Sequence, residues 1–292
     1  MSSDWTPSTD WTAWAQALIP AMDAAGAAIL EVARNGFEVH RKADASPVTE
    51  ADLAANRVLL AAIRELTPAP ILSEEGCGMP AASGQPSLYW AVDPLDGTKE
   101  FLRQNGEYTV NVALIESGIP VLGLVLQPIN GDLWLGINGS SARVRRDGVW
   151  HAISSAPLAG RPRVSVPRPP IAPPMAPRIA LSRSHASNAL GNCLAHLGEY
   201  EPVTLGSSLK LTWLAEGKLD LYPRLNSGMS QWDLAAGHAV LLAAGGAVVT
   251  LQGAPLRYCY SEHRVPAFLA IADRNAGWPE RFRAARSQAD AL

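Results

Sequence analysis

The region from residue 108 to residue 153 constrains the fold most strongly, because apolar runs there alternate with two-residue turn signals. The runs are separated by Ser117-Gly118, Asn130-Gly131, Asn138-Gly139 and Asp147-Gly148. Asn-Gly and Asp-Gly favour the tight turns that join antiparallel strands. A series of such hairpins excludes an all-helical fold and predicts an antiparallel meander. Arginine alternates with apolar residues over residues 142–146, which predicts a solvated edge strand protected by its charge.

Helices and strands are both expected outside the meander. Apolar residues recur at helical spacing over residues 10–34 and 49–65. Residues 71–72 and 88–92 are short apolar runs, which are typical of buried strands. Further strands are expected near residues 178–181, 219–222, 247–251 and 267–272, and further helices near 187–197, 207–216 and after Trp232. The sequence therefore predicts the α/β (α+β) fold class.

The composition supports a folded protein and excludes several functions. The 292 residues are 48% hydrophobic and 17% charged, which provides ample apolar material for a core. A net charge of −3 excludes a strongly basic nucleic-acid binder. The three cysteines are scattered and favour a reducing compartment over a disulfide scaffold. Because the N-terminal residues lack the pattern of a secretory signal, a cytoplasmic location is expected.

Residues 234–251 form an apolar stretch that resembles a membrane span. The 18 residues contain no Asp, Glu, Lys or Arg, and this length is near the minimum for crossing a bilayer. Gly245-Gly246 interrupts the stretch, and residues 248–250 suit a strand. We therefore predict a buried helix, a turn and a strand, and no transmembrane segment.

Carboxylates lie next to apolar segments at four places in the chain, at the ends of predicted strands or at the starts of predicted helices. Glu74 follows the apolar run at 71–72, and Asp93 and Asp96 follow the run at 88–92. Asp52 lies in the first turn of a predicted helix, and Asp233 opens another. Magnesium prefers oxygen ligands in near-octahedral geometry, and three or four carboxylates with a carbonyl can hold two or three such ions. The pattern predicts a magnesium site.

The segment between and after the two aspartates suits phosphate chemistry. Pro94 stiffens the turn, so that the Leu95 carbonyl could face a metal. A helix that starts near Gly97-Thr98 would offer free amides to a phosphate. Paired cations would lower the pKa of a water molecule and stabilise the attacking and leaving oxygens. Asp52 and the Thr98 hydroxyl are candidates to orient and deprotonate that water.

Each of these acidic features also has an ordinary structural explanation. Asp93 and Asp96 alone could be turn residues. Asp52 and Asp233 alone could be charges stabilised by a helix dipole. Glu74-Glu75 alone could be a solvated pair. Their joint occurrence beside buried sequence favours the metal site.

At these positions the chain resembles the inositol monophosphatase superfamily of Mg²⁺-dependent phosphatases. The resemblance rests on residues 90–98 and 232–237 and extends over nearly the whole chain. It implies a layered αβαβα sandwich, two or three Mg²⁺ ions and frequent homodimers. It also implies catalytic roles for Asp52, Thr98 and Glu74. The metal ligands it implies are Glu74, Asp93, the Leu95 carbonyl, Asp96 and Asp233.

Four other segments resemble one branch of this superfamily, which removes the 3′-phosphate of adenosine 3′,5′-bisphosphate (PAP). They are residues 42–49, 99–101, 182–185 and 206–210. The branch also accepts the sulfated analogue (PAPS) and implies a nucleotide bisphosphate partner, with the cytoplasm or the inner-membrane surface as its place. Arg224 stands where inositol monophosphatases have a glutamate, and its guanidinium favours a second phosphate. Arg183 could add positive charge. The predicted substrate-binding residues are Gly97, Thr98, Ser184, His185, Ser208, Lys210, Arg224 and Asp233.

Two alternatives remain open at this stage. One is an inositol monophosphatase or another phosphatase of small phosphomonoesters, such as histidinol phosphate. The other is a non-catalytic protein that binds nucleotides.

A proline-rich stretch divides the chain. Residues 161–178 contain seven prolines, a density that excludes a helix or a central strand. We predict an N-terminal α+β domain over residues 1–160 with the meander and most metal ligands. A linker or loop over 161–178 follows, and then a C-terminal α/β domain over 179–292 with Asp233 and the substrate pocket.

Overall fold

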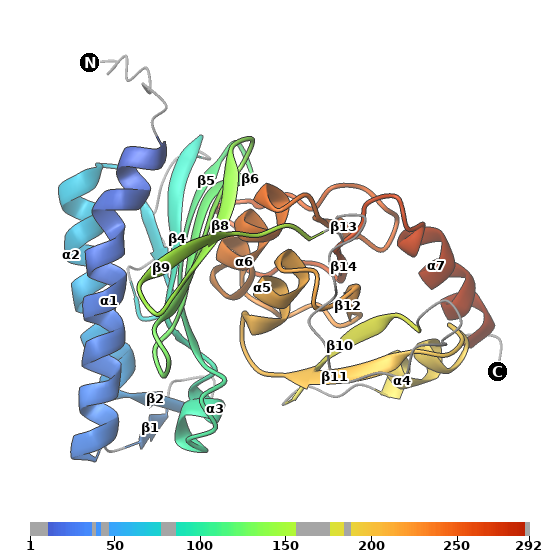
Figure 1. Ribbon diagram of the computed structural model, residues 1–292, viewed down its shortest axis with the longest axis horizontal. Helices are drawn as coiled ribbons and strands as arrows, with labels where there is room; N and C mark the ends of the chain where they lie inside the picture. The colour runs from blue at the N-terminus through green and yellow to red at the C-terminus, as the bar shows by residue number, and fades with distance from the viewer. Residues whose placement is uncertain are drawn as a thin grey trace.

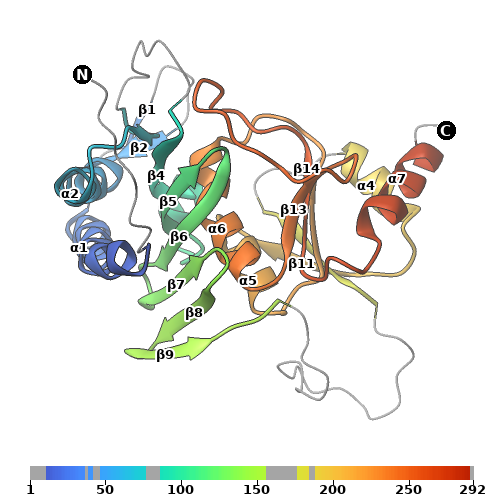
Figure 2. The same ribbon diagram turned by 90° about the horizontal axis from the view of Figure 1, so that it is seen from above.

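The computed structural model describes residues 11–36, 39–41, 47–76, 86–155, 176–183 and 188–289. Helices and two sheets alternate in five layers, which confirms the predicted αβαβα sandwich (Figures 1 and 2). The elements of the first part are α1 (Trp11–Asn35), β1 (Val39–Arg41), β2 (Pro47–Thr49), α2 (Glu50–Leu66), β3 (Ile71–Ser73), β4 (Leu88–Asp96), α3 (Thr98–Leu102), β5 (Thr109–Glu116), β6 (Ile119–Gln127), β7 (Asp132–Ile137), β8 (Ser141–Arg146) and β9 (Val149–Ala152). Those of the second part are β10 (Arg178–Ser182), α4 (Asn188–Ala195), β11 (Glu201–Leu205), α5 (Leu209–Ala215), β12 (Leu221–Arg224), α6 (Gln231–Ala243), β13 (Ala247–Thr250), β14 (Phe268–Ile271) and α7 (Trp278–Ala289).

The larger sheet contains the predicted meander. Its seven strands run in the order β3-β4-β5-β6-β7-β8-β9. β3 and β4 are parallel, and every later pair is antiparallel. The glycines of the four predicted turns all have positive φ, as tight hairpins require.

Both faces of the larger sheet are covered. On β5, Val110, Val112 and Leu114 pack in the core shared with α1 and α2, and Ala113 packs in the core shared with α5 and α6. Side chains of a strand alternate between its faces, so Asn111 lies on the same face as Ala113. This two-sided burial explains why these strands are almost continuously apolar.

The smaller sheet has the strand order β11-β10-β12-β14-β13. α4 and α7 cover its outer face, and α5 and α6 fill the layer between the two sheets (Figure 2). α6 approaches the larger sheet closely at Gly123 and Gly136. A Cβ at Gly123 would overlap the carbonyl of Ala236, and one at Gly136 would overlap the backbone of Val240. These two glycines therefore set the depth of α6 in the sandwich.

Two apolar helices, α6 and α1, were compared with the requirements for a membrane-spanning segment. The stretch at 234–251 forms α6, a turn at Gly245 and β13, as predicted. α1 is long and apolar enough by length and composition to cross a membrane, and 39% of its most apolar window is buried. Its buried residues Leu18, Met22 and Ile29 recur at helical spacing and pack in the core with α2 and the larger sheet.

The prediction of an edge strand at residues 142–146 is wrong. β8 pairs with β7 on one side and with β9 on the other, because the Asp147-Gly148 turn returns the chain for one more strand. Two of the three arginines of β8 instead have carboxylate partners. Arg145 contacts Asp23, and Arg146 contacts Asp132 and Glu216.

Several elements were not expected from the sequence. These are β1, β2, β9, β11 and α7. Residues 161–175 of the proline-rich stretch lie outside the described residues, so the division into domains stays a prediction.

Candidate active site

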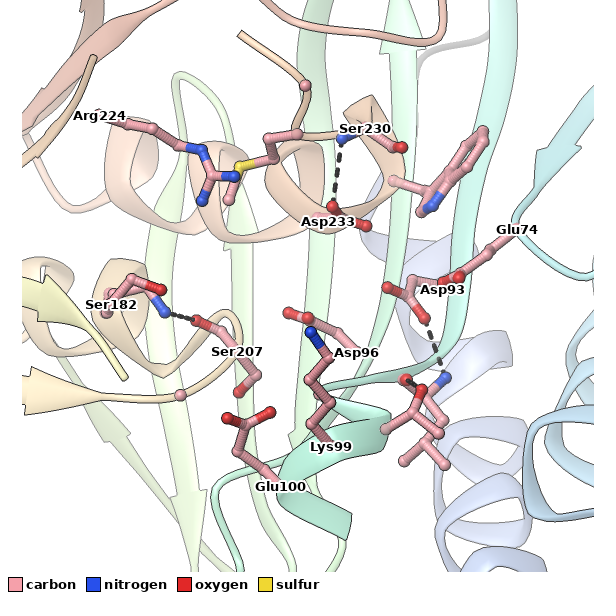
Figure 3. A pocket seen from close by; sticks show the side chains of 18 of the residues that line it. Glu74, Asp93, Asp96, Lys99, Glu100, Ser182, Ser207, Arg224, Ser230 and Asp233 are labelled. Atoms are coloured by element: carbon pink, nitrogen blue, oxygen red, sulfur yellow. Dashed lines mark hydrogen bonds between the residues drawn. The ribbon is translucent and has the colours of Figure 1, made fainter. Parts of the chain in front are cut away.

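Four of the predicted carboxylates line one pocket between the two halves of the molecule, with a volume of about 450 Å³ (Figure 3). Glu74 enters from the end of β3, Asp93 and Asp96 from β4, and Asp233 from the first turn of α6. The packing of α6 against the larger sheet brings Asp233 beside residues that precede it by more than a hundred positions.

An irregularity in β4 presents both of its aspartates to the pocket. The register between β4 and β5 shifts between Asp93 and Asp96, where Pro94 interrupts the ladder. Oδ1 of Asp93 accepts a hydrogen bond of 3.0 Å from the Leu95 amide, which fixes the turn. The Leu95 carbonyl lies 3.4 Å from the Thr98 hydroxyl. The sequence Asp-Pro-Leu-Asp thus forms a bulge that supplies three oxygens.

Three carboxylates converge closely enough to share a cation. One oxygen each from Glu74, Asp93 and Asp233 lies within 4.8 Å of the others. Asp93 is 1% exposed, and its buried Oδ2 has no hydrogen-bond partner among the residues that the structure describes. A buried, unpaired carboxylate oxygen is costly, and a cation would compensate it. The donor set therefore fits Mg²⁺, while Asp96 lines the same pocket beside this group of three.

Burial and mutual repulsion raise the pKa values of these carboxyl groups. The pKa of Asp93 lies well above its usual value, first through burial and then through the charges of Glu74, Asp96 and Asp233. Burial, and then the charges of Asp96 and Glu74, raise the pKa of Asp233 to about 8. Burial raises the pKa of Asp96 to about 6, although the positive charge of Lys210 opposes this shift. Such a concentration of mutually repelling carboxylates is characteristic of a functional site.

Asp52 reaches the same region from α2. It is 2% exposed, and its Oδ2 accepts hydrogen bonds of 2.7 Å from the backbone amide and the hydroxyl of Thr49. Its Oδ1 lies 3.4 Å from the hydroxyl of Thr98. The carboxylate of Asp52 therefore both stabilises the start of α2 and contacts the hydroxyl of Thr98. Asp233 likewise caps its own helix, since its Oδ2 accepts from the Ser230 amide at 3.1 Å.

The predicted helix start at Gly97-Thr98 is present. α3 begins at Thr98, and Gly97 precedes it with φ of 91°, a left-handed conformation that favours glycine. Amides in the first turn of a helix have no earlier carbonyl to bind. Gly97, Thr98 and Lys99 line the pocket beside the carboxylates, so this helix start lies at the wall of the pocket.

The predicted substrate-binding residues are placed differently from one another. Lys210 and Arg224 line the pocket, and the ammonium group of Lys210 also donates to the carbonyls of Leu205 and Ser207. Ser208 is buried, and its hydroxyl bonds to Asp96. Arg183 is paired with Glu107 through two nitrogens and is absent from the described lining. Ser184 and His185 lie outside the described residues.

The pocket also contains residues that the sequence did not single out. Ser207, adjacent to the predicted Ser208, lines the wall, as does Lys99 directly after Thr98. On another wall the rings of Trp232 and His263 stack nearly parallel, with centroids 5.6 Å apart. Trp232 precedes Asp233, whereas no sequence signal pointed to His263.

The fold and the site together define a class of layered, metal-dependent phosphatases, in which carboxylates from both halves surround a cation site beside a helix start. The sequence profile of the Inositol monophosphatase family matches residues 10–284. The chain therefore belongs to the inositol monophosphatase family, whose members depend on Mg²⁺.

Several proteins of known name that are similar to this chain belong to one group within the family. The 3′(2′),5′-bisphosphate nucleotidase CysQ of Salmonella typhimurium is 43% identical over 237 residues, covering 80% of this chain and 89% of that protein. CysQ of Escherichia coli K12 has the same identity and coverage. The crystal structure of CysQ from Bacteroides thetaiotaomicron superposes with a TM-score of 0.71 at 34% identity and covers 91% of this chain and 99% of that chain. An inositol monophosphatase from Zymomonas mobilis shares the fold at 22% identity, with a TM-score of 0.72.

Proposed function

We propose that this protein is a Mg²⁺-dependent phosphatase that hydrolyses the 3′-phosphate of PAP to AMP and phosphate, with PAPS as a second substrate. The observation that carries this proposal is the convergence of Glu74, Asp93 and Asp233 beside the helix start at Thr98. The relatives named as bisphosphate nucleotidases support the choice of substrate.

The oxygen donors around the pocket would hold the cations. They are the carboxylates of Glu74, Asp93, Asp96 and Asp233 and the carbonyl of Leu95. Mg²⁺ bound there supplies Lewis-acid polarisation of phosphoryl oxygens and lowers the pKa of water. We propose two or three ions, because Asp96 extends the donor set beyond the group of three.

The protein's own residues orient the substrate and accept the proton. The amides of Gly97 and Thr98 hold the 3′-phosphoryl group. Water attacks phosphorus while the bond between phosphorus and the 3′-oxygen breaks, and AMP leaves with a proton from solvent on that oxygen. The attacking water gives a proton to the Thr98 hydroxyl, whose own proton passes to Oδ1 of Asp52 over 3.4 Å. Glu74, which lies with Asp93 and Asp233, helps to orient the water.

The second phosphate of the substrate distinguishes PAP from inositol phosphates. Arg224 lines the pocket, and its buried Nε has no hydrogen-bond partner in the described part of the chain. Lys210 lines the same pocket and is 4% exposed. A guanidinium group can bind a phosphate through two nitrogens. We propose that Arg224 and Lys210 attract the 5′-phosphate, and that Ser184, His185 and Ser208 belong to the same subsite.

A phosphate-release screen over nucleotides and sugar phosphates tests the proposal. We expect Mg²⁺-dependent release from PAP, with a kcat/KM far above that for inositol 1-phosphate or histidinol phosphate. Asp96→Ala should abolish release. Faster cleavage of inositol 1-phosphate would contradict the substrate assignment, and nucleotide binding without turnover at any Mg²⁺ concentration would contradict the enzymatic one.

Two further properties are proposed on family grounds. We propose a homodimer, which sedimentation of the purified protein tests. We also propose a cytoplasmic location, with the inner-membrane surface as the alternative, which fractionation of cells distinguishes.

A further inference from the structure

Asp96 is held by two buried polar side chains from two other elements, Asn111 on β5 and Ser208 at the start of α5. We propose that Asn111 and Ser208 are positioning residues, which fix the carboxylate of Asp96 in the orientation that a divalent cation requires. This inference rests on the proposed function, since it concerns the same metal site.

Asn111 lies in the centre of the larger sheet with no exposed surface. It pairs with Asp93 across the ladder between β4 and β5, and the shift in register after Asp93 brings Asp96 within its reach. Its Nδ2 donates to Oδ2 of Asp96 at 3.3 Å and to the hydroxyl of Ser208 at 2.9 Å. Both hydrogens of the amide nitrogen are therefore committed to this cluster.

Ser208 occupies the N-cap of α5 but does not cap it. A serine at this position usually accepts from an amide of the first turn, whereas here the side chain makes no such bond. Its hydroxyl instead lies 3.1 Å from Oδ2 of Asp96 and 2.9 Å from the carbonyl of Asp233. Instead of capping α5, the hydroxyl of Ser208 connects two of the proposed metal ligands, Asp96 and Asp233.

The arrangement leaves one oxygen of Asp96 for a cation. Among the described residues, all hydrogen bonds to the Asp96 carboxylate go to Oδ2, and Oδ1 takes part in none. Asn111 and Ser208 are uncharged, so they orient the carboxylate without neutralising it. Such neighbours of metal ligands fix ligand geometry, and their loss typically costs about 10-fold to 100-fold in metal affinity.

Calorimetric titration of the metal-free protein with Mg²⁺, without substrate, tests the proposal. We expect Asn111→Leu and Ser208→Ala to weaken Mg²⁺ binding by about 10-fold to 100-fold. Ser208→Thr keeps the hydroxyl and should stay near the parent. Thr109→Val is the matched control, because Thr109 is buried on the same strand and no described residue forms a hydrogen bond with its hydroxyl. It should bind Mg²⁺ as the parent does.

Two further readouts separate positioning from a general loss of structure. The melting temperature in EDTA shows whether each variant is folded, and KM of Asn111→Leu for PAP at saturating Mg²⁺ should change less than about threefold. Because both residues act through Asp96, the double variant should bind Mg²⁺ little worse than the weaker single variant.

Folded Asn111→Leu and Ser208→Ala proteins that bind Mg²⁺ within twofold of the parent would overturn the inference, as would equal weakening in Thr109→Val. Failure of the proposed function looks different. The parent would then bind Mg²⁺ and respond to these substitutions, yet release no phosphate from PAP.

Discussion

The hydroxyl of Thr98 lies 3.4 Å from Oδ1 of Asp52, although 46 residues separate them in the chain. The other oxygen of Asp52 is occupied by the cap of α2, where Thr49 donates to it twice. The carboxylate is thus anchored through one oxygen and presents the other to the Thr98 hydroxyl. Because the two oxygens of Asp52 have different partners, substitutions can test the proposed proton transfer separately from the stability of α2.

Removal of the Thr98 hydroxyl should therefore slow the reaction. In Thr98→Val the shape is retained but the proton path to Asp52 is lost. We expect kcat for PAP to fall about 100-fold, within the range for general acid–base catalysis, with KM nearly unchanged. Steady-state kinetics at saturating Mg²⁺ measures both constants, and an unchanged kcat would contradict the proton path.

Thr49→Ala is the matched control for that experiment. It removes the helix cap and one bond to Oδ2 of Asp52, which should cost about 1 kcal/mol of unfolding free energy. Because Oδ1 keeps its contact with Thr98, kcat should fall much less than in Thr98→Val. Urea denaturation measures the free energy of unfolding, and the same kinetic assay measures kcat.

Stability and metal binding should depend on pH in opposite ways. The pKa values of Asp96 and Asp233 are raised to about 6 and about 8, so the folded protein holds more protons on these groups than the unfolded chain between about pH 4 and pH 8. Their contribution to metal-free stability is present at low pH and is lost as pH rises through that window. Mg²⁺ needs the ionised carboxylates and competes with those protons.

The difference between the melting temperatures in Mg²⁺ and in EDTA should consequently grow from about pH 5.5 to about pH 8.5. This difference cancels groups far from the site, such as the buried His238, whose pKa is lowered to about 3 by burial. A constant or shrinking difference would show that the raised pKa values are not linked to the cation.

Substitution of Arg224 should change substrate preference. In Arg224→Glu we expect kcat/KM for PAP to fall about 100-fold, since a charged contact to the 5′-phosphate is replaced by repulsion. The value for inositol 1-phosphate should hold or rise. Arg183→Ala is the comparison, because Arg183 is already paired with Glu107. An equal loss for both substrates in Arg224→Glu would argue against specificity.

The close approach of α6 to the larger sheet predicts an effect on stability. Gly123→Ala would place a methyl group against the Ala236 carbonyl, and overpacking of this kind costs about 1–3 kcal/mol. Gly191→Ala, in α4 with open space around it, should instead stabilise by about 0.5–1 kcal/mol through helix propensity. Chemical denaturation distinguishes the two, and equal effects would contradict the packing argument.

Local signals in the sequence predicted much of the fold. The Asn-Gly and Asp-Gly pairs marked the hairpins, and helical periodicity marked α1 and α2. β11 was missed because Glu201 and Pro202 give it a polar, proline-containing start. α7 was missed because it buries little beyond Trp278, Phe282 and Ala285.

The sequence predicted the site residues that lie at the ends of buried strands or at helix starts. It did not predict contacts that depend on how distant segments pack together. Glu74, Asp93 and Asp233 converge as expected from their positions at the ends of β3 and β4 and the start of α6. The bulge that turns Asp96 toward Asn111 depends on strand pairing, which no local pattern encodes. His263 lines the pocket from a loop, and its backbone carbonyl accepts a hydrogen bond from the backbone amide of Gln231. This contact joins segments that are distant in the sequence, so no local pattern predicts it.

The most direct test of the central claim is the anomalous diffraction of a crystal soaked in Mn²⁺, which takes the same oxygen ligands as Mg²⁺. The account predicts a peak enclosed by Glu74, Asp93 and Asp233, beside the bulge that carries Asp96. Carboxylates that turn away from one another around an empty pocket, with manganese bound elsewhere or not at all, would contradict it.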